Sequence, residues 1–306
     1  MPREVFINSK PVDQERDHTP IAEIKKAREE HTIEVSGISV EQFNSYKETF
    51  LKGVDFEKLR TIFTNIYRRS GFDPQTMNFI GPEGIILFQP AGVRGMYEVG
   101  RNCISIAPEN MLMPIEDGRS YERAFFNMIL ALIHEQTHAV SKNISSAQYR
   151  GDYEQSKTMQ TGYTVMMNGA RRFFEQFNEG VVEKLARQIA DEYFEQVGWT
   201  KEDVEAYKKR KEEHPETMHY AENIQTVEFI VDRVSEFAGV SKTTVFEALV
   251  SGLMHGEIFK EEEVKDLFAQ AFGWDFLSRL STLNTHPFSV ENMANLMARY
   301  KKSSAQ

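Results

Sequence analysis

Apolar residues recur at helical spacing along much of the chain, and the spacing becomes strand-like near its middle. Residues 39–53 and 55–72 carry apolar side chains three and four positions apart, with Gly at or near each end, which predicts two helices. From residue 78 to about 108, short runs rich in β-branched and aromatic residues alternate with Gly and Pro. This second pattern predicts a small sheet.

A buried helix is predicted over about 120–140, because apolar residues occur on nearly every side of it. These apolar residues are Phe125, Phe126, Ile129, Leu130, Leu132 and Ile133.

Beyond this helix, Asn168-Gly169 stands between two strand-like runs, which is a strong signal for a hairpin. A further helix is predicted from about Asn178, and the chain from about 200 reads as nearly all helical. We therefore expect an α+β fold, mostly helical with a small sheet. We divide it into a loose charged arm over 1–35 with a short helix near 20–31, a central part over 36–200 and a helical lobe over 201–306.

The composition of the chain argues against several classes of function and site. The 306 residues carry a formal net charge of -10, which argues against a broad nucleic-acid-binding face. The one cysteine, Cys103, excludes an intrachain disulfide and a cysteine-based zinc site. The first twenty residues lack the apolar stretch of a secretory signal, and we find no apolar run of membrane-spanning length. We expect a cytoplasmic protein without a membrane partner.

The stretch ALIHEQTHAV, 131–140, carries the chemistry. His134 and His138 are four positions apart, so both imidazoles lie on one face of the helix and are placed to bind one zinc ion, with Glu135 beside it. Chance would produce this H-E-x-x-H pattern only about 0.02 times in a chain of this composition. Without a metal ion, burying these three groups would cost several kcal/mol or shift their pKa values.

A zinc site with an open position for water needs a third protein ligand. Our best candidate is Glu179 in FNEGVVEKLAR, at the expected start of a helix, where a carboxylate is favourable. Glu183 lies one turn further along the same face, where it could accept the second N–H of a ligand histidine. The other possible third ligands are Asp152, Glu154 and His219.

The pair H134-E-Q-T-H138 followed by N178-E179-G180 resembles the gluzincins, the zinc metallopeptidases whose ligands are two histidines and one glutamate. The resemblance covers roughly 78–200 and implies a zincin-like fold. The run GMYEVGRNCISIAP, 95–108, is similar to the strand that pairs with extended substrates in zincins. The gap between the two motifs is about twice that of the commonest members, and the Asn168-Gly169 hairpin would fill it.

The resemblance implies a zinc-dependent peptidase that acts on a peptide or protein substrate. In that reading Glu135 is the general base, and Glu183 is the acidic neighbour of the ligands. Tyr220 or His219 resembles the downstream donor that stabilises the oxyanion. The alternative donors are Tyr163 and Tyr153.

Two other functions stay open at this point. A metallopeptidase-like domain could bind a partner or sense a ligand without turnover, although binding zinc alone does not require Glu135. Residues 237–252, FAGVSKTTVFEALVSG, also fit a helix-turn-helix regulator, but Lys242 is their one basic residue, which is poor for DNA binding.

Overall fold

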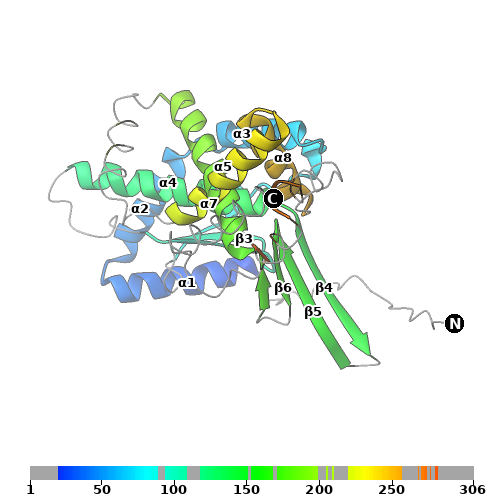
Figure 1. The fold of residues 1–306 in the computed structure, drawn as a ribbon. Helices are drawn as coiled ribbons and strands as arrows, with labels where there is room; N and C mark the ends of the chain where they lie inside the picture. The colour runs from blue at the N-terminus through cyan, green and yellow to red at the C-terminus, as the bar shows by residue number, and fades with distance from the viewer. Residues whose placement is uncertain are drawn as a thin grey trace. The chain divides into compact units, whose positions relative to one another are not determined.

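Figure 1 shows a computed structural model of the chain. The described residues are 20–88, 94–108, 118–150, 153–167, 171–198 and 220–256, with 205, 209, 268, 270–273, 276 and 280–281. The chain divides into two compact units. One unit comprises 15–140 and 185–213, and the other 1–14, 141–184 and 214–306.

The unit over 15–140 and 185–213 begins with three helices: α1 (Ile21–Ser36), α2 (Val40–Gly53) and α3 (Phe56–Arg69). Ser39 and Gln42 form a capping box at the start of α2, and Asp55 accepts a hydrogen bond from the Lys58 N–H at the start of α3. These caps satisfy backbone donors that the first turn leaves unpaired, which is why both helices begin where the sequence predicts.

A three-stranded mixed sheet follows the helices. Its strands are β1 (Ile85–Leu87), β2 (Gly95–Glu98) and β3 (Cys103–Ile106), in the order β1-β3-β2. β3 is parallel to β1 and antiparallel to β2, so β2 is an edge strand. The short 3-10 helices η1 (Pro74–Thr76) and η2 (Pro82–Gly84) precede β1. The small sheet predicted over 78–108 is confirmed.

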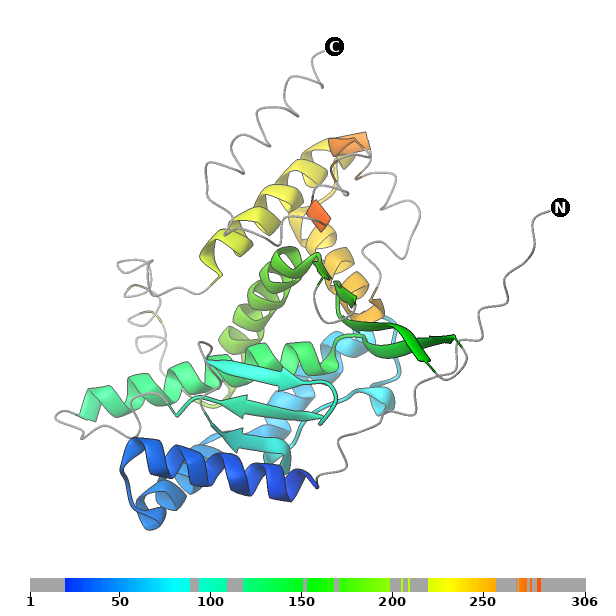
Figure 2. The same ribbon diagram turned by 90° about the horizontal axis from the view of Figure 1, so that it is seen from below.

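Helices cover both faces of this sheet. α1 packs against β1, and α4 (Gly118–Val140) packs against β2 and β3. Figures 1 and 2 show α1 on one side of the sheet and α4 on the other. The predicted buried helix over 120–140 is therefore confirmed, and the sheet lies against its last turns.

The apolar face of α4 is held by aromatic contacts. Phe125 packs edge-on against Phe50 of α2, and Phe126 stacks on Phe194 with the ring centroids 4.3 Å apart. A side chain at Gly53 would collide with the Phe125 ring, so this glycine lets the end of α2 approach α4 closely. These contacts fix the helix that carries the H-E-x-x-H pattern.

The second unit contains a four-stranded antiparallel sheet in the order β4-β5-β6-β7. Its strands are β4 (Asn143–Arg150), β5 (Tyr153–Thr161), β6 (Thr164–Met167) and β7 (Arg171–Phe173). β6 and β7 pair on either side of residues 168–170, which confirms the predicted hairpin; the Asn168-Gly169 turn itself lies outside the described residues. The long β4–β5 hairpin was not predicted.

The described helices of the second unit include α7 (Ala221–Ala238) and α8 (Lys242–His255), with the first part of α5 (Glu175–Gln196). α7 ends at Gly239 in the left-handed conformation, and Ser241 caps α8, so 237–252 form a helical hairpin as predicted. The Lys242 ammonium lies 2.7 Å from the Asp232 carboxylate. Its charge is therefore balanced by α7, which weakens the DNA-binding reading.

The described residues are α+β and mostly helical, as predicted. The expected division into 1–35, 36–200 and 201–306 differs from the two compact units, and 21–36 form the 16-residue α1 where we expected a short helix in a loose arm. Among the described helices, none combines the length and apolar character that crossing a bilayer requires.

A half-buried ion pair ties α1 to β2. The Arg28 guanidinium donates to both carboxylate oxygens of Glu98 and to the Ser105 hydroxyl, and Arg101 donates to Glu98 at 2.8 Å. Burial alone would raise the pKa of Glu98, but Arg28 and Arg101 together hold it below its usual range. A carboxyl group with a lowered pKa stabilises the fold above its unfolded-state pKa and loses that contribution as the pH falls.

We predict that Glu98→Gln lowers the free energy of unfolding by about 2 kcal/mol at pH 7, because Arg28 keeps its burial but loses its charge partner. Urea unfolding measured from pH 7 to pH 3 checks this. The difference from wild type should begin to shrink below the ordinary carboxyl pKa of 4.5, where the unfolded chain takes up the proton, and should disappear as the pH falls through the lowered pKa of native Glu98. The exposed Glu48, paired with Lys52 on α2, provides the control, since Glu48→Gln should cause no measurable change.

Candidate metal centre

Five consecutive polar residues near the end of α4 are buried. Gln136 and Thr137 are fully buried, and His134, Glu135 and His138 are 6%, 8% and 8% exposed. Buried polar groups are costly unless each finds a partner. The Thr137 hydroxyl bonds the Ile133 carbonyl within the helix, so the other four residues must find their partners outside the local turn or in one another.

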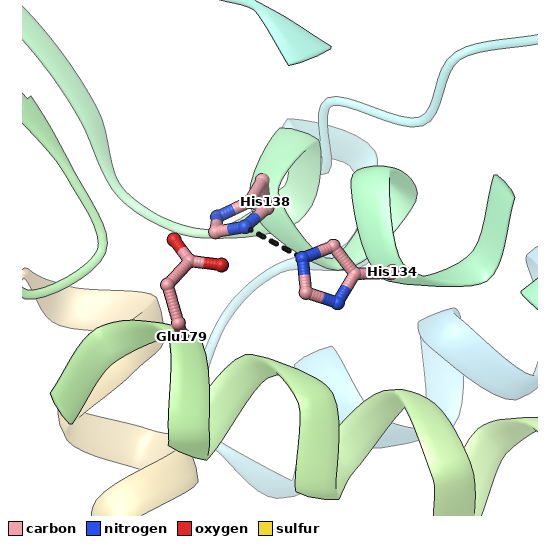
Figure 3. A group of neighbouring side chains, drawn as sticks. All are labelled: His134, His138 and Glu179. Atoms are coloured by element: carbon pink, nitrogen blue, oxygen red, sulfur yellow. Dashed lines mark hydrogen bonds between the residues drawn. The ribbon is translucent and has the colours of Figure 1, made fainter. Parts of the chain in front are cut away.

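The two histidines face each other through the same ring atom. Their Nε2 atoms are 3.2 Å apart, and the rings are tilted by 70° (Figure 3). Two neutral rings are compatible with this distance only when one Nε2 donates its hydrogen to the other, or when both lone pairs bind one cation. Two nitrogens on a tetrahedral zinc ion would be about 3.4 Å apart, so the observed spacing fits a shared ion.

Glu179 completes the group. Ligand atoms of His134, His138 and Glu179 all lie within 4.8 Å of one another, and Figure 3 shows the Glu179 carboxylate turned toward the imidazoles. α5 begins at Glu175, earlier than the predicted start near Asn178, so Glu179 lies in the second turn and not at the helix terminus. The helix dipole, which acts mainly at the first turn, therefore does not account for a carboxylate here. What distinguishes Glu179 is that its carboxylate faces the two histidines.

The donor set matches the chemistry of a zinc ion. Two imidazole nitrogens and one carboxylate oxygen are the ligands of hydrolytic zinc sites, which keep a further position for water or substrate. A calcium or magnesium site would be built from oxygen ligands instead. The structure thus contains a His/His/Glu group close enough to bind a metal ion, and the donor types favour zinc.

Glu135 is held from the side of the sheet. Its Oε2 accepts a hydrogen bond from the backbone N–H of Tyr97 at 2.7 Å. Tyr97 lies on β2, opposite Ile104 of β3, and its N–H points to Glu135 instead of into the ladder. A side chain at Gly95 would come within 2.8 Å of Glu135 Cγ, so this glycine lets the edge strand lie directly on the carboxylate.

The structure says less about the other candidate metal ligands and about Glu183. Asp152 and His219 lie outside the described residues, as does the side chain of Glu154 on β5. Glu183 lies on α5 one turn after Glu179 and is half-buried. Its orienting role stays a prediction.

The structure distinguishes among the tyrosines that were candidate donors to the oxyanion. Tyr163 is fully buried, its hydroxyl donates to the Leu249 carbonyl, and burial raises its pKa, so it is a structural tyrosine. Tyr220 precedes α7 with φ 64°, a left-handed conformation that is uncommon for a tyrosine. Tyr153 lies on β5, and its side chain is outside the described residues.

Tyr220 immediately precedes α7, whose first turn packs against the segment that carries Glu179. The Asn223 side chain, in the first turn of α7, donates to the Gln176 backbone carbonyl at 2.8 Å and to its side-chain oxygen at 2.7 Å. Gly180 also packs on the Asn223 backbone so closely that a β-carbon would collide with it. The first turn of α7 therefore packs against α5 on both sides of Glu179.

Sequence reasoning missed several residues that support the centre. The Gln136 side chain accepts from the Ile80 N–H and donates to the Asn78 carbonyl. Asn178 accepts from the Tyr163 N–H at 2.8 Å, which joins the β5–β6 turn to α5 next to Glu179. The H-E-x-x-H pattern fixes only the spacing of the histidines and the glutamate. It gives no sign of the partners of Gln136, because residues 78 and 80 are remote from it in the sequence.

Comparisons of the chain with models of known protein families, with curated proteins and with solved structures find no match. The His134/His138/Glu179 group is therefore the observation that any account of function must start from.

We predict that the purified protein binds about one zinc ion per chain, and that His134→Ala, His138→Ala and Glu179→Ala each lose it, because each removes one of three ligands. Glu183→Ala should weaken zinc binding only about 10–100-fold, since it removes at most an orienting hydrogen bond. Elemental analysis and competition with a chelator measure both effects.

Glu192→Ala is the matched control, because Glu192 is an exposed carboxylate on the same helix as Glu179. It should bind zinc as wild type does. Zinc binding by Glu179→Ala at wild-type affinity would show that the third ligand is another residue, with Asp152, Glu154 and His219 the next to test.

Proposed function

We propose that the chain is a zinc-dependent peptidase with a zincin-like fold. The observation that carries the proposal is the buried group of His134, His138 and Glu179, with Glu135 directly beside the first histidine on the same helix. It is supported by the resemblance of H134-E-Q-T-H138 and N178-E179-G180 to the gluzincin motifs.

Each residue has a role that its position supports. His134, His138 and Glu179 would hold the ion, which supplies Lewis-acid polarisation of a carbonyl group and makes a water molecule acidic near neutral pH. The Glu135 carboxylate accepts a proton from the attacking water and returns it to the leaving amine. Tyr220 is the proposed donor to the developing oxyanion, because it precedes the turn of α7 that packs beside Glu179.

The substrate class follows from β2. Among the described strands β2 lies at the edge of its sheet, beside Glu135. The Tyr97 N–H is taken by Glu135, so we propose that an extended chain would pair with the other outward backbone groups of β2. A peptide paired along β2 would bring its carbonyl groups past the carboxylate of Glu135. An extended peptide or protein segment is therefore the proposed substrate.

Glu135 also separates this proposal from a domain that binds a ligand without turnover. Zinc binding needs the two histidines and Glu179, and gains nothing from a fourth ionisable group buried beside them. The burial of the Glu135 carboxylate, which is 8% exposed, therefore supports a role in proton transfer, because ionisable groups in unusual environments gather at catalytic sites.

We predict that Glu135→Gln keeps zinc and the fold but loses about 10²–10⁴-fold in hydrolysis, because a carboxamide does not accept the proton. Cleavage of a random peptide library, followed by mass spectrometry, measures the activity. Glu192→Gln should hydrolyse peptides as wild type does. Wild-type activity in Glu135→Gln would mean that another group is the base.

Gly95→Ala provides a test from the side of the sheet. The added methyl would lie 2.8 Å from Glu135 Cγ and must displace the carboxylate or the edge strand. We expect zinc affinity to stay near that of wild type while kcat falls about tenfold or more. Gly100→Ala is the control, since a β-carbon there meets no atom within 4 Å.

A further inference from the structure

The edge strand β2 is anchored to α4 by side chains that the proposed mechanism does not use. They are Asn78, Tyr97, Asn102 and Gln136, which we call the polar bracket. Asn78 and Gln136 connect the segment before β1 to α4, and Tyr97 and Asn102 belong to β2 and the turn after it.

Asn78 is the centre of the polar bracket. Its amide lies 2.8 Å from Asn102 Oδ1, 2.9 Å from the Tyr97 hydroxyl and 3.2 Å from the Ala139 carbonyl. Ala139 directly follows His138, and its carbonyl belongs to the last turn of α4, where no helical N–H remains to bond it. One side chain thus bonds the end of the metal-binding helix and the tip of the β2–β3 hairpin.

Tyr97 is held at both of its ends. Its hydroxyl donates to Asn102 Oδ1 at 3.1 Å, while its backbone N–H donates to Glu135 Oε2 at 2.7 Å. Burial raises the pKa of Tyr97 to about 12, so the hydroxyl keeps its hydrogen at neutral pH. Asn102 adopts φ 51°, a left-handed conformation that asparagine tolerates better than most residues, and this directs the hairpin turn.

Gln136 closes the polar bracket from within the helix. Its fully buried amide accepts from the Ile80 N–H at 3.2 Å and donates to the Asn78 carbonyl at 3.4 Å. The backbone of 78–80 is therefore fixed to the residue that directly follows Glu135. Because Gln136 and Asn78 act on opposite ends of the same helical turn, the segment cannot slide along α4 without breaking both sets of bonds.

We infer that Asn78, Gln136 and the Tyr97 hydroxyl are positioning residues, which hold β2 against α4 and so fix the carboxylate of Glu135 through the Tyr97 N–H. This inference rests on the proposed function only for its effect on hydrolysis. The geometric claim concerns the polar bracket itself and has its own readout, the exchange of the Tyr97 amide hydrogen with solvent.

The exchange experiment uses full-length protein labelled with [15N]tyrosine, which gives at most 11 amide signals. The signal of Tyr97 is the one that is missing from the spectrum of Tyr97→Phe. Because Tyr97 does not donate its N–H to β3, Glu135 is the group that protects it. We expect slow exchange in wild type, and at least tenfold faster exchange in Glu135→Ala and in Asn78→Ala. Asn78 does not contact that N–H, so the second result reports positioning.

Asn65→Ala is the control, because Asn65 is an exposed asparagine on α3 whose amide oxygen lies 3.5 Å from Arg68. It should leave the Tyr97 amide as protected as in wild type. Equal protection of this amide in Asn78→Ala and Asn65→Ala would overturn the inference, and so would unprotected exchange in wild type.

Tyr97→Phe is a gentler second variant that keeps the ring and loses only the hydroxyl. Tyr193→Phe is its match, because the Tyr193 hydroxyl accepts from the Asp55 N–H at 2.8 Å, far from β2 in the sequence. We expect Tyr97→Phe to lower kcat about tenfold, with zinc affinity and KM near wild type, and to speed deuterium uptake by the peptide over 95–98. Tyr193→Phe should do neither.

The two proposals fail differently. If wild type hydrolyses no peptide while Asn78→Ala still exposes the Tyr97 amide, the peptidase proposal fails and the polar bracket stands. If wild type hydrolyses peptides and neither Asn78→Ala nor Tyr97→Phe changes amide exchange, the polar bracket fails and the peptidase proposal stands.

Discussion

The burial of His134, Glu135 and His138 in α4 is the constraint on which the other features depend. Transferring ionisable groups from water to a packed interior costs several kcal/mol unless each acquires a partner. Both histidines are less than a tenth exposed, and their Nε2 atoms face each other at 3.2 Å. A shared cation with the Glu179 carboxylate as its third ligand would compensate this burial, since the negative charge balances part of the cation's charge.

The surrounding fold supplies partners for the polar residues of the same turn. β2 brings a backbone N–H to Glu135, and the segment before β1 occupies both ends of the Gln136 amide. α4 is in turn fixed by aromatic contacts with α2 and α5. The edge of the sheet and the helix are thus held in one arrangement by bonds that begin within five residues, 134–138.

Local signals in the sequence predicted much of this arrangement. The apolar spacing of α2 and α3, the apolar pattern of α4 and the four-residue spacing of the histidines depend only on near neighbours. Glu179 was predicted from its motif. The reason first given for its position, a helix start, was wrong, because α5 begins at Glu175. The long-range partners of Glu135 and Gln136 were not predictable. A hydrogen bond between residues 38 or 56 positions apart produces no periodic pattern in the sequence.

Two elements show how local patterns mislead. α1 was expected to be mostly a loose arm because its sequence is strongly charged, yet Thr32 is buried and Arg28 pairs with Glu98 across the sheet. Strands β4 and β5 carry few large apolar residues, so their alternation was too weak to detect. Tertiary contacts therefore stabilise α1, and pairing with each other stabilises β4 and β5, although the composition of these elements is neutral or unfavourable.

X-ray absorption at the zinc edge of the purified protein tests the central claim most directly, because it reports the ligands without requiring a substrate. The account predicts a first shell of nitrogen and oxygen atoms only, at about 2.0–2.1 Å, with the outer-shell scattering of two imidazole rings. A protein without zinc after metal-replete growth, or a zinc ion with fewer than two imidazole ligands, would contradict it.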